Sequence, residues 1–179
     1  MKKISRIILL LIITLFITTG CEENTGTSQT NPGKNEIISN GERVDTSTMK
    51  HKHCTRDASA GTNTELVLEY DVYYTGEILN ILISHEELIT NDQETLQTYE
   101  TAYKQIAVNY EGLEHYEQKV TKTKNSVTNE IKINYDEIDI KKLLAIEGEE
   151  DNIIEDGKAK VDLYLALLKK FGGKCEDVA

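Results

Sequence analysis

The chain has 179 residues, a formal net charge of −11 and three cysteines, and its pI is about 4.9. This length suggests one domain with appended segments. The excess of acidic residues argues against a nucleic-acid partner, because such a partner requires a basic surface that displaces counterions from phosphates.

The first 20 residues have the pattern of an export signal. Basic residues precede an apolar run over residues 7–17, which is too short for a standard membrane span. The run ends at Thr18-Thr19-Gly20-Cys21, where small residues before a lone cysteine resemble the bacterial lipobox. This pattern predicts cleavage after residue 20 and lipid attachment (diacylglycerol, palmitate) at Cys21. An ordinary secretory signal or an uncleaved apolar anchor are the alternatives.

Residues 21–50 are expected to be a disordered polar tether. The segment is rich in Asn, Thr, Ser, Gly and Glu, contains the single proline, and has few aliphatic residues. Such a composition buries too little apolar area to offset the entropy lost on ordering. The compact domain is therefore placed at residues 51–179.

Two segments of alternating apolar residues begin the predicted fold. Residues 65–74 carry Leu66, Leu68, Tyr70, Val72 and Tyr74 on one side. After Thr75-Gly76, residues 77–85 place Leu79, Ile81 and Ile83 together on one side. Two such runs around a short turn with glycine predict a β-hairpin.

A helix is expected next, over residues 90–110. Thr90-Asn91-Asp92 offers N-cap candidates, Asn91 and Glu94 fit a capping box, and an apolar stripe runs from Leu96 to Tyr110. A second hairpin follows, with strands over 113–121 and 127–135. A short helix at 138–146, an acidic loop at 147–157 and a last helix at 158–171 complete the chain.

The expected order is therefore ββαββ(α)α. Adjacent hairpins give antiparallel pairing, and helices must cover one face of the sheet. The predicted fold class is α+β, with a four-stranded antiparallel sheet packed on two main helices.

Two cysteines remain beside Cys21, and they lie near the two ends of the predicted domain. An exported protein tolerates disulfides, and the termini of a domain often lie close together. A bond between Cys54 and Cys175 is therefore expected. Two free thiols or metal ligation are the alternatives.

Four segments carry a resemblance to a known family. They are Cys54-Thr55-Arg56-Asp57, Tyr70-Asp71-Val72-Tyr73-Tyr74, Ile133-Asn134-Tyr135-Asp136 and the run from Leu168 to Cys175. Over residues 54–177 the chain resembles the YehR-like family of small bacterial lipoproteins, a family of unknown function. The resemblance implies a lipoprotein with a compact α+β domain, and it supplies no catalytic residue.

A weak metal-binding candidate lies before the first predicted strand. Met49, His51 and His53 precede Cys54, and imidazole and sulfur are ligands that copper, zinc and nickel accept. The spacing matches no standard zinc signature, and two lysines in the segment would repel a cation. A solvated segment is the simpler interpretation, so no metal site and no cofactor are predicted.

The charge map suggests a partner-binding surface. No lysine or arginine occurs between Arg56 and Lys104, whereas this interval contains ten acidic residues. Glu69 and Asp71 alternate on the polar side of the first predicted strand, and a surface of one sign attracts cations or a basic partner. The alternative is a solvated face over which like charges are spread.

No recognisable catalytic motif occurs in the sequence. We therefore expect a non-enzymatic, monomeric lipoprotein on the extracytoplasmic side of the cell membrane. Its domain would bind an envelope protein or a small ligand, with a bias toward cationic partners, and would not bind nucleic acid. A metal-handling accessory role for Met49, His51 and His53 is the alternative function.

Overall fold

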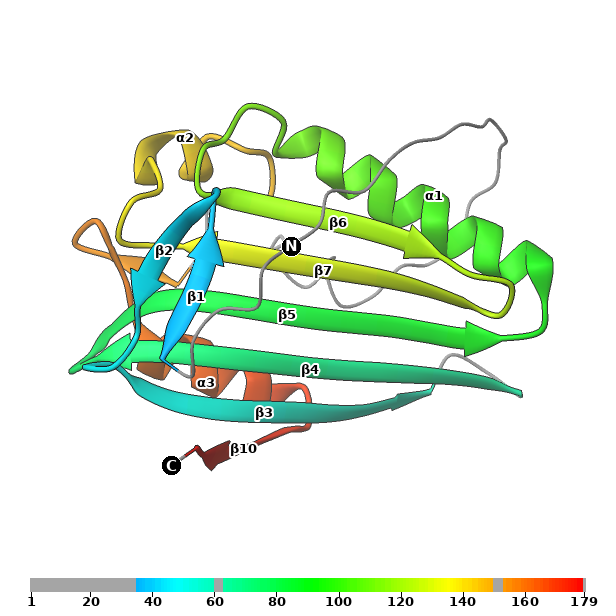
Figure 1. Cartoon of the computed structure of the whole chain (residues 1–179), viewed down its shortest axis with the longest axis horizontal. Coiled ribbons are helices and arrows are strands. Elements are labelled where there is room, and N and C mark those ends of the chain that lie inside the picture. The colour runs from blue at the N-terminus through cyan, green and yellow to red at the C-terminus, as the bar shows by residue number, and fades with distance from the viewer. Residues whose placement is uncertain (1–34, 60–62, 150–152, 179) are drawn as a thin grey trace, which may run out of the picture.

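The computed structural model describes residues 35–59, 63–149 and 153–178. The predicted signal, Cys21 and residues 22–34 of the predicted tether lie outside these residues. The described chain is built in layers, with an antiparallel sheet covered by helices on one face (Figure 1). The predicted α+β class is thus confirmed.

The main sheet has six strands within the described residues, and every neighbouring pair is antiparallel. In spatial order they are β10 (Gly173–Asp177), β3 (Lys50–Ser59), β4 (Thr64–Thr75), β5 (Ile78–Thr90), β7 (Ser126–Asn134) and β6 (Tyr116–Lys122). The two predicted hairpins are β4–β5 and β6–β7. The prediction of four strands is wrong, because β3 and β10 extend the sheet beyond β4. Both added strands are polar and lack the aliphatic alternation that identifies a half-buried strand.

The helices in the described ranges are α1 (Gln93–Asn109), α2 (Ile140–Leu144) and α3 (Val161–Lys170). The N-cap of α1 is Asp92, whose carboxylate accepts a hydrogen bond from the Glu94 backbone N–H at 3.1 Å. The predicted pairing of Asn91 with Glu94 is therefore shifted by one residue. A two-stranded turn of β8 (Ile154–Glu155) and β9 (Lys158–Ala159) precedes α3. None of these helices is long and apolar enough to cross a membrane.

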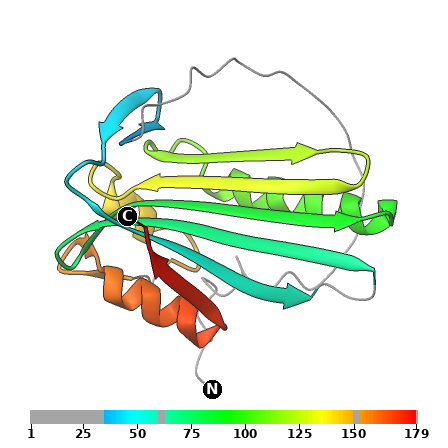
Figure 2. The same ribbon diagram turned by 60° about the horizontal axis from the view of Figure 1, so that its bottom comes forward.

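Helices α1 and α3 lie along the sheet (Figure 2), and the hydrophobic core fills the space between helices and sheet. Buried side chains of β4, β5 and β7 meet those of α3, among them Val72, Leu82, Ile131, Tyr164 and Leu168. A second cluster under α1 contains Leu88, Leu96, Tyr103 and Val127. Burial of this apolar surface is the main force that holds the helices on the sheet.

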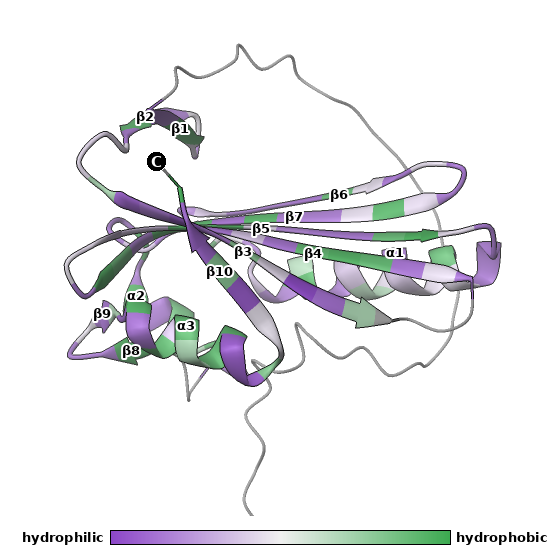
Figure 3. Ribbon diagram, turned by 90° about the horizontal axis from the view of Figure 1, so that it is seen from below, coloured by the Kyte–Doolittle hydropathy of each residue, from purple (hydrophilic) through white to green (hydrophobic). Residues whose placement is uncertain are grey.

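Part of the predicted tether is folded. Residues 36–45 form the hairpin of β1 (Glu36–Ser39) and β2 (Glu42–Asp45), which lies on the sheet face opposite the helices (Figure 3). Its turn, Asn40-Gly41, has positive φ at both residues, as two-residue hairpins prefer. Ile37 is buried, and Lys132 of β7 donates a hydrogen bond to the Ile38 carbonyl. The expectation of disorder up to residue 50 thus fails here, because two aliphatic residues and a turn signal suffice once a sheet is present to pack against.

The predicted disulfide is present. Cys54 and Cys175 face each other across β3 and β10, and their sulfurs are 2.05 Å apart. The bond fixes the last strand to the sheet edge and closes a loop of 121 residues. Cys54 is fully buried, so the crosslink also forms part of the core.

Removal of this bond should destabilise the domain. We expect the double variant C54A/C175A to lose about 4 kcal/mol of unfolding free energy, since a crosslink over a long loop restricts the unfolded chain. Urea unfolding of the variant and of the wild-type protein measures the difference. Reduction of the wild-type protein is the control and should lower its urea midpoint as well. An unchanged midpoint in both experiments would contradict a stabilising role for the bond.

Candidate functional site

The sheet face opposite the helices, here called the open face, is covered only in part by described residues. The β1–β2 hairpin lies over one end of it (Figure 3), where Ile81 is fully buried. Along β4 this face carries Val67, Glu69, Asp71 and Tyr73, because the alternate residues Leu68, Tyr70 and Val72 are buried in the core. The predicted candidates Glu69 and Asp71 therefore do lie on one face.

Five of the ten acidic residues in the predicted one-sign stretch occupy the open face. The antiparallel register places them at Asp57, Glu65, Glu69, Asp71 and Glu87. The other five lie elsewhere: at the β4–β5 turn, inside the domain, or on and before α1, as Glu77, Glu86, Asp92, Glu94 and Glu100. The sequence interval thus contributes half of its acids to a single surface.

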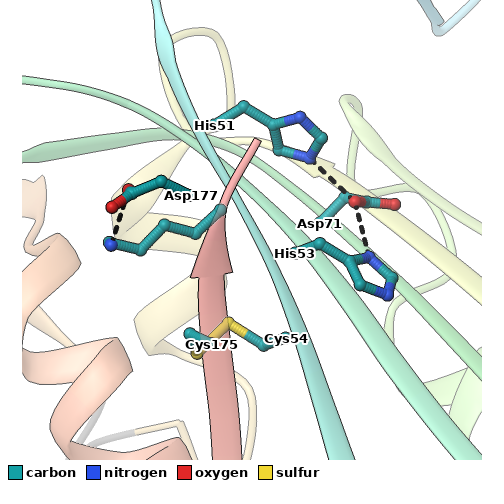
Figure 4. Close-up of a disulfide and its surroundings, with 7 residues drawn as sticks. His51, His53, Cys54, Asp71, Cys175 and Asp177 are labelled. Atoms are coloured by element: carbon teal, nitrogen blue, oxygen red, sulfur yellow. Dashed lines mark hydrogen bonds and ion pairs between the residues drawn. A yellow bond between two sulfur atoms is a disulfide. The ribbon is translucent and has the colours of Figure 1, made fainter. Parts of the chain in front are cut away.

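Asp71 and Glu69 have different environments. One carboxylate oxygen of Asp71 contacts two imidazoles, His51 Nε2 at 2.8 Å and His53 Nδ1 at 3.1 Å (Figure 4). The His51 ring also stacks on Tyr73, with ring centroids 4.2 Å apart. Glu69 makes no hydrogen bond or ion pair within the described residues, so its charge is available to an external partner whereas that of Asp71 is already engaged.

Aliphatic and acidic side chains alternate beyond this histidine cluster. Cross-strand neighbours on this face of β4 and β5 are, in order, Glu65 with Ile89, Val67 with Glu87, Glu69 with His85, and Asp71 with Ile83. Val67, Ile83 and Ile89 keep part of their surface accessible. We call Glu65, Val67, Glu69, Ile83, Glu87 and Ile89 the β4–β5 patch. Within the described chain Glu65 and Glu87, like Glu69, have no ion-pair partner.

The predicted metal segment is placed on β3, beside this patch. His51 and His53 point to the same oxygen of Asp71, which no analysis of the local sequence could show, because Asp71 comes from the next strand. The Cys54 sulfur is bonded to Cys175 and cannot act as a thiolate ligand. Over residues 35–59, 63–149 and 153–178, no group of three or more His, Cys, Asp and Glu side chains is arranged to hold a metal ion. The metal-handling alternative stays a prediction.

Glu86 is buried, although its neighbour Glu87 lies on the open face. Its side of β5 also carries Leu82, Ser84 and Leu88, so it enters the layer between sheet and helices. Burial raises the pKa of Glu86 from 4.5 to about 7, and hydrogen bonding by the Tyr103 hydroxyl and Asn129 opposes this rise in part. In the sequence, the period-two spacing of Glu86 with Leu88 was the signal that could have identified Glu86 as a buried residue.

A second acid also turns inward. Glu149, from the predicted acidic loop, is buried and accepts a hydrogen bond from the Tyr110 hydroxyl at the end of α1. Burial and the nearby Glu149 carboxylate together raise the pKa of Tyr110 above its ordinary value. Residues 150–152 of the same loop lie outside the described residues. The predicted acidic loop thus directs one of its carboxylates into the domain.

Comparisons with known proteins show what this arrangement of layers resembles. No protein-family model matches the sequence, and no curated protein matches it. The NMR structure of the YehR protein of E. coli is similar, with a TM-score of 0.52 and 16% identity, over 73% of this chain and 93% of that chain. The NMR structure of a protein from Streptococcus pneumoniae TIGR4 has a TM-score of 0.50 and 12% identity, over 89% and 99% of the two chains.

At these identities the likeness concerns the fold. The chain is an α+β protein, and its fold is YehR-like.

The buried carboxyl of Glu86 should make stability depend on pH in a characteristic way. Because its folded pKa is raised, the native state holds this proton more tightly, and its stabilising effect is lost as pH rises from 4.5 to about 7. Glu86→Gln removes the titration and keeps the shape. The stability of E86Q relative to wild type should increase by about 3 kcal/mol across this interval.

Urea unfolding at a series of pH values measures this difference. Glu87→Gln is the matched control, because it removes the adjacent carboxyl on the opposite face. A relative stability of E86Q that stays constant with pH would show that Glu86 does not titrate with a raised pKa.

Proposed function

We propose that this protein is an exported lipoprotein whose α+β domain binds a basic protein partner through the β4–β5 patch. The observation that carries the proposal is a set of three acids without ion-pair partners among the described residues. These are Glu65, Glu69 and Glu87, and partly exposed aliphatic side chains lie between them. The domain acts as a binding module and not as an enzyme.

The composition of the patch defines the partner's chemistry. Carboxylates without ion-pair partners attract lysine and arginine side chains and accelerate encounter with them. The aliphatic neighbours add apolar area, whose removal from water contributes about 25 cal/mol per Å². A surface that alternates lysine or arginine with aliphatic side chains would match both features.

Electrostatics beyond the patch also favour a basic partner. The chain has a net charge of −11 before any processing, and loss of the basic residues in the signal would make it more acidic. A nucleic acid or an anionic lipid surface would be repelled. These charges support a cationic protein in the envelope as the partner.

Three observations support export and lipid attachment. The N-terminal segment has the pattern of a signal followed by Cys21. The Cys54–Cys175 bond is typical of proteins that fold outside the reducing cytoplasm. The YehR-like fold agrees with the resemblance to that family of lipoproteins. We therefore place the domain on the extracytoplasmic side of the membrane, held there by acyl chains on Cys21.

The lipid anchor depends on one side chain. Cys21→Ser should abolish diacylglycerol attachment and leave an unprocessed precursor, because the thioether cannot form. Metabolic labelling with palmitate and immunoblotting of membrane fractions measure both effects, and globomycin should produce the same precursor from wild-type protein. A processed, membrane-bound and labelled C21S protein would exclude the lipoprotein assignment.

Charge reversal of the patch should abolish partner binding. In pull-downs from envelope extracts, the triple variant E65K/E69K/E87K should capture about one tenth of the partner that wild type captures, or less. The reason is that like charges across an interface repel. Raised ionic strength should weaken the wild-type interaction, because exposed charges are screened.

The matched control is the triple variant E111K/E114K/E137K. It makes the same change in net charge at exposed positions outside the open face. The proposal fails if both triple variants lose the partner equally, or if wild-type binding is independent of salt. Circular dichroism of each variant establishes that the domain is folded.

A further inference from the structure

A cavity of about 100 Å³ lies between the sheet and the helices, on the opposite side of the sheet from the β4–β5 patch. Its apolar walls come from the core of β5, β7 and α3. Its polar walls include Tyr70, Ser84, Glu86, Tyr110, Glu149 and Tyr164. A hole in a close-packed core loses dispersion contacts on all its walls. This cavity also buries two carboxyl groups, which costs further free energy. A cavity with such a lining is therefore unusual for a purely structural feature.

One polar group in this cavity lacks a partner. Tyr70 is only 4% exposed, and its hydroxyl makes no hydrogen bond within the described residues. A buried polar atom without a partner costs about 1–3 kcal/mol, and most such atoms in folded proteins are paired. Since Tyr70 lines the cavity, a molecule in the cavity could supply the missing bond.

The charges around the cavity have one sign. Glu86 and Glu149 both line it, and each is only 6% exposed. No lysine, arginine or histidine is among the lining residues. Arg56 is close enough to lower the pKa of Glu86 slightly, but it does not line the cavity. Among the described lining residues, the cavity thus offers acceptor oxygens, and no basic side chain accompanies the Glu86 carboxyl there.

Aromatic rings also line the cavity. Five of the lining residues are tyrosines, and two of them, Tyr110 and Tyr116, stack with centroids 4.2 Å apart. The face of an aromatic ring attracts a cation, most strongly where water is excluded. Acceptor oxygens, carboxylates and ring faces together are the chemistry that recognises an ammonium group.

Size restricts the ligand further. An apolar cavity of about 150 Å³ holds benzene, so a cavity of about 100 Å³ holds roughly four heavy atoms. We propose that this cavity is a binding site for a small organic amine in its ammonium form, with Glu86 as the charge partner and the Tyr70 hydroxyl as a hydrogen-bond acceptor. A primary amine fits best, because its three N–H donors match several separate acceptors.

This site is independent of the proposed partner-binding function. Glu86 and Glu87 are consecutive, but β5 directs them to opposite faces of the sheet. Failure of the cavity proposal therefore leaves the patch proposal standing, and the reverse also holds.

The test is an NMR titration of the full chain with propylammonium chloride at neutral pH. Resonances of Tyr70, Ser84 and Tyr164 should shift and saturate. Because 1-propanol has the same number of heavy atoms and no charge, it should bind at least about tenfold more weakly.

Variants identify the groups that recognise the amine. Glu86→Gln should weaken propylammonium binding at least about tenfold, and Tyr70→Phe should weaken it severalfold, as expected for loss of a charged and a neutral hydrogen-bond partner. Glu87→Gln should bind like wild type. The amide spectrum of each variant reports whether it is folded, and Tyr70→Phe tests the proposal even if E86Q does not fold.

Two results would overturn the proposal. Equal binding of propylammonium and 1-propanol would show an apolar void without charge recognition. An absence of shifts at the lining residues, at tens of millimolar propylammonium, would show a cavity that holds water only.

Discussion

The alternation of side chains along the β4–β5 hairpin, interrupted once by a bulge between Tyr73 and Tyr74, is the constraint on which the rest of this structure depends. A strand directs successive residues to opposite faces. Since helices cover one face, each residue of β5 is assigned either to the core layer or to the open face. The consecutive acids Glu86 and Glu87 show the effect most clearly, because the first lines an internal cavity and the second belongs to an external patch.

The domain therefore has two acidic regions in different dielectric environments. Charges on the open face are exposed to solvent, where like charges create a potential that extends beyond the surface. The Glu86 carboxyl inside the domain is desolvated, which raises its pKa and favours its neutral form unless a cation reaches it. The Cys54–Cys175 bond is made at the same side of the sheet as the core, where it holds the short edge strand β10 in place. The sheet thus separates the solvated acids of the open face from the acids that are buried beneath the helices.

Much of the fold could be predicted from local pattern. Regular spacing of apolar residues identified β4–β5, β6–β7, α1 and α3. Each of these elements buries one side, so its apolar residues recur with the period of a strand or of a helix. Elements without such periodic spacing of apolar residues were not predicted. Strands β3 and β10 are polar, and β1–β2 is a short hairpin in a polar segment. A bulge between Tyr73 and Tyr74 shifts the pairing so that Leu79 joins the core while Ile81 faces the other side, against the predicted common face.

The sequence by itself determined the α+β class, the pair of cysteines that close the domain, and the presence of Glu69 and Asp71 on one side of a strand. Only the tertiary structure decided which acids can act. It brings His51 and His53 onto Asp71, leaves Glu69 without a partner among the described residues, and buries Glu86 and Glu149 with tyrosines. The physical reason is that pairing and desolvation of a charge depend on neighbours from distant strands and helices, which no local spacing of residues encodes.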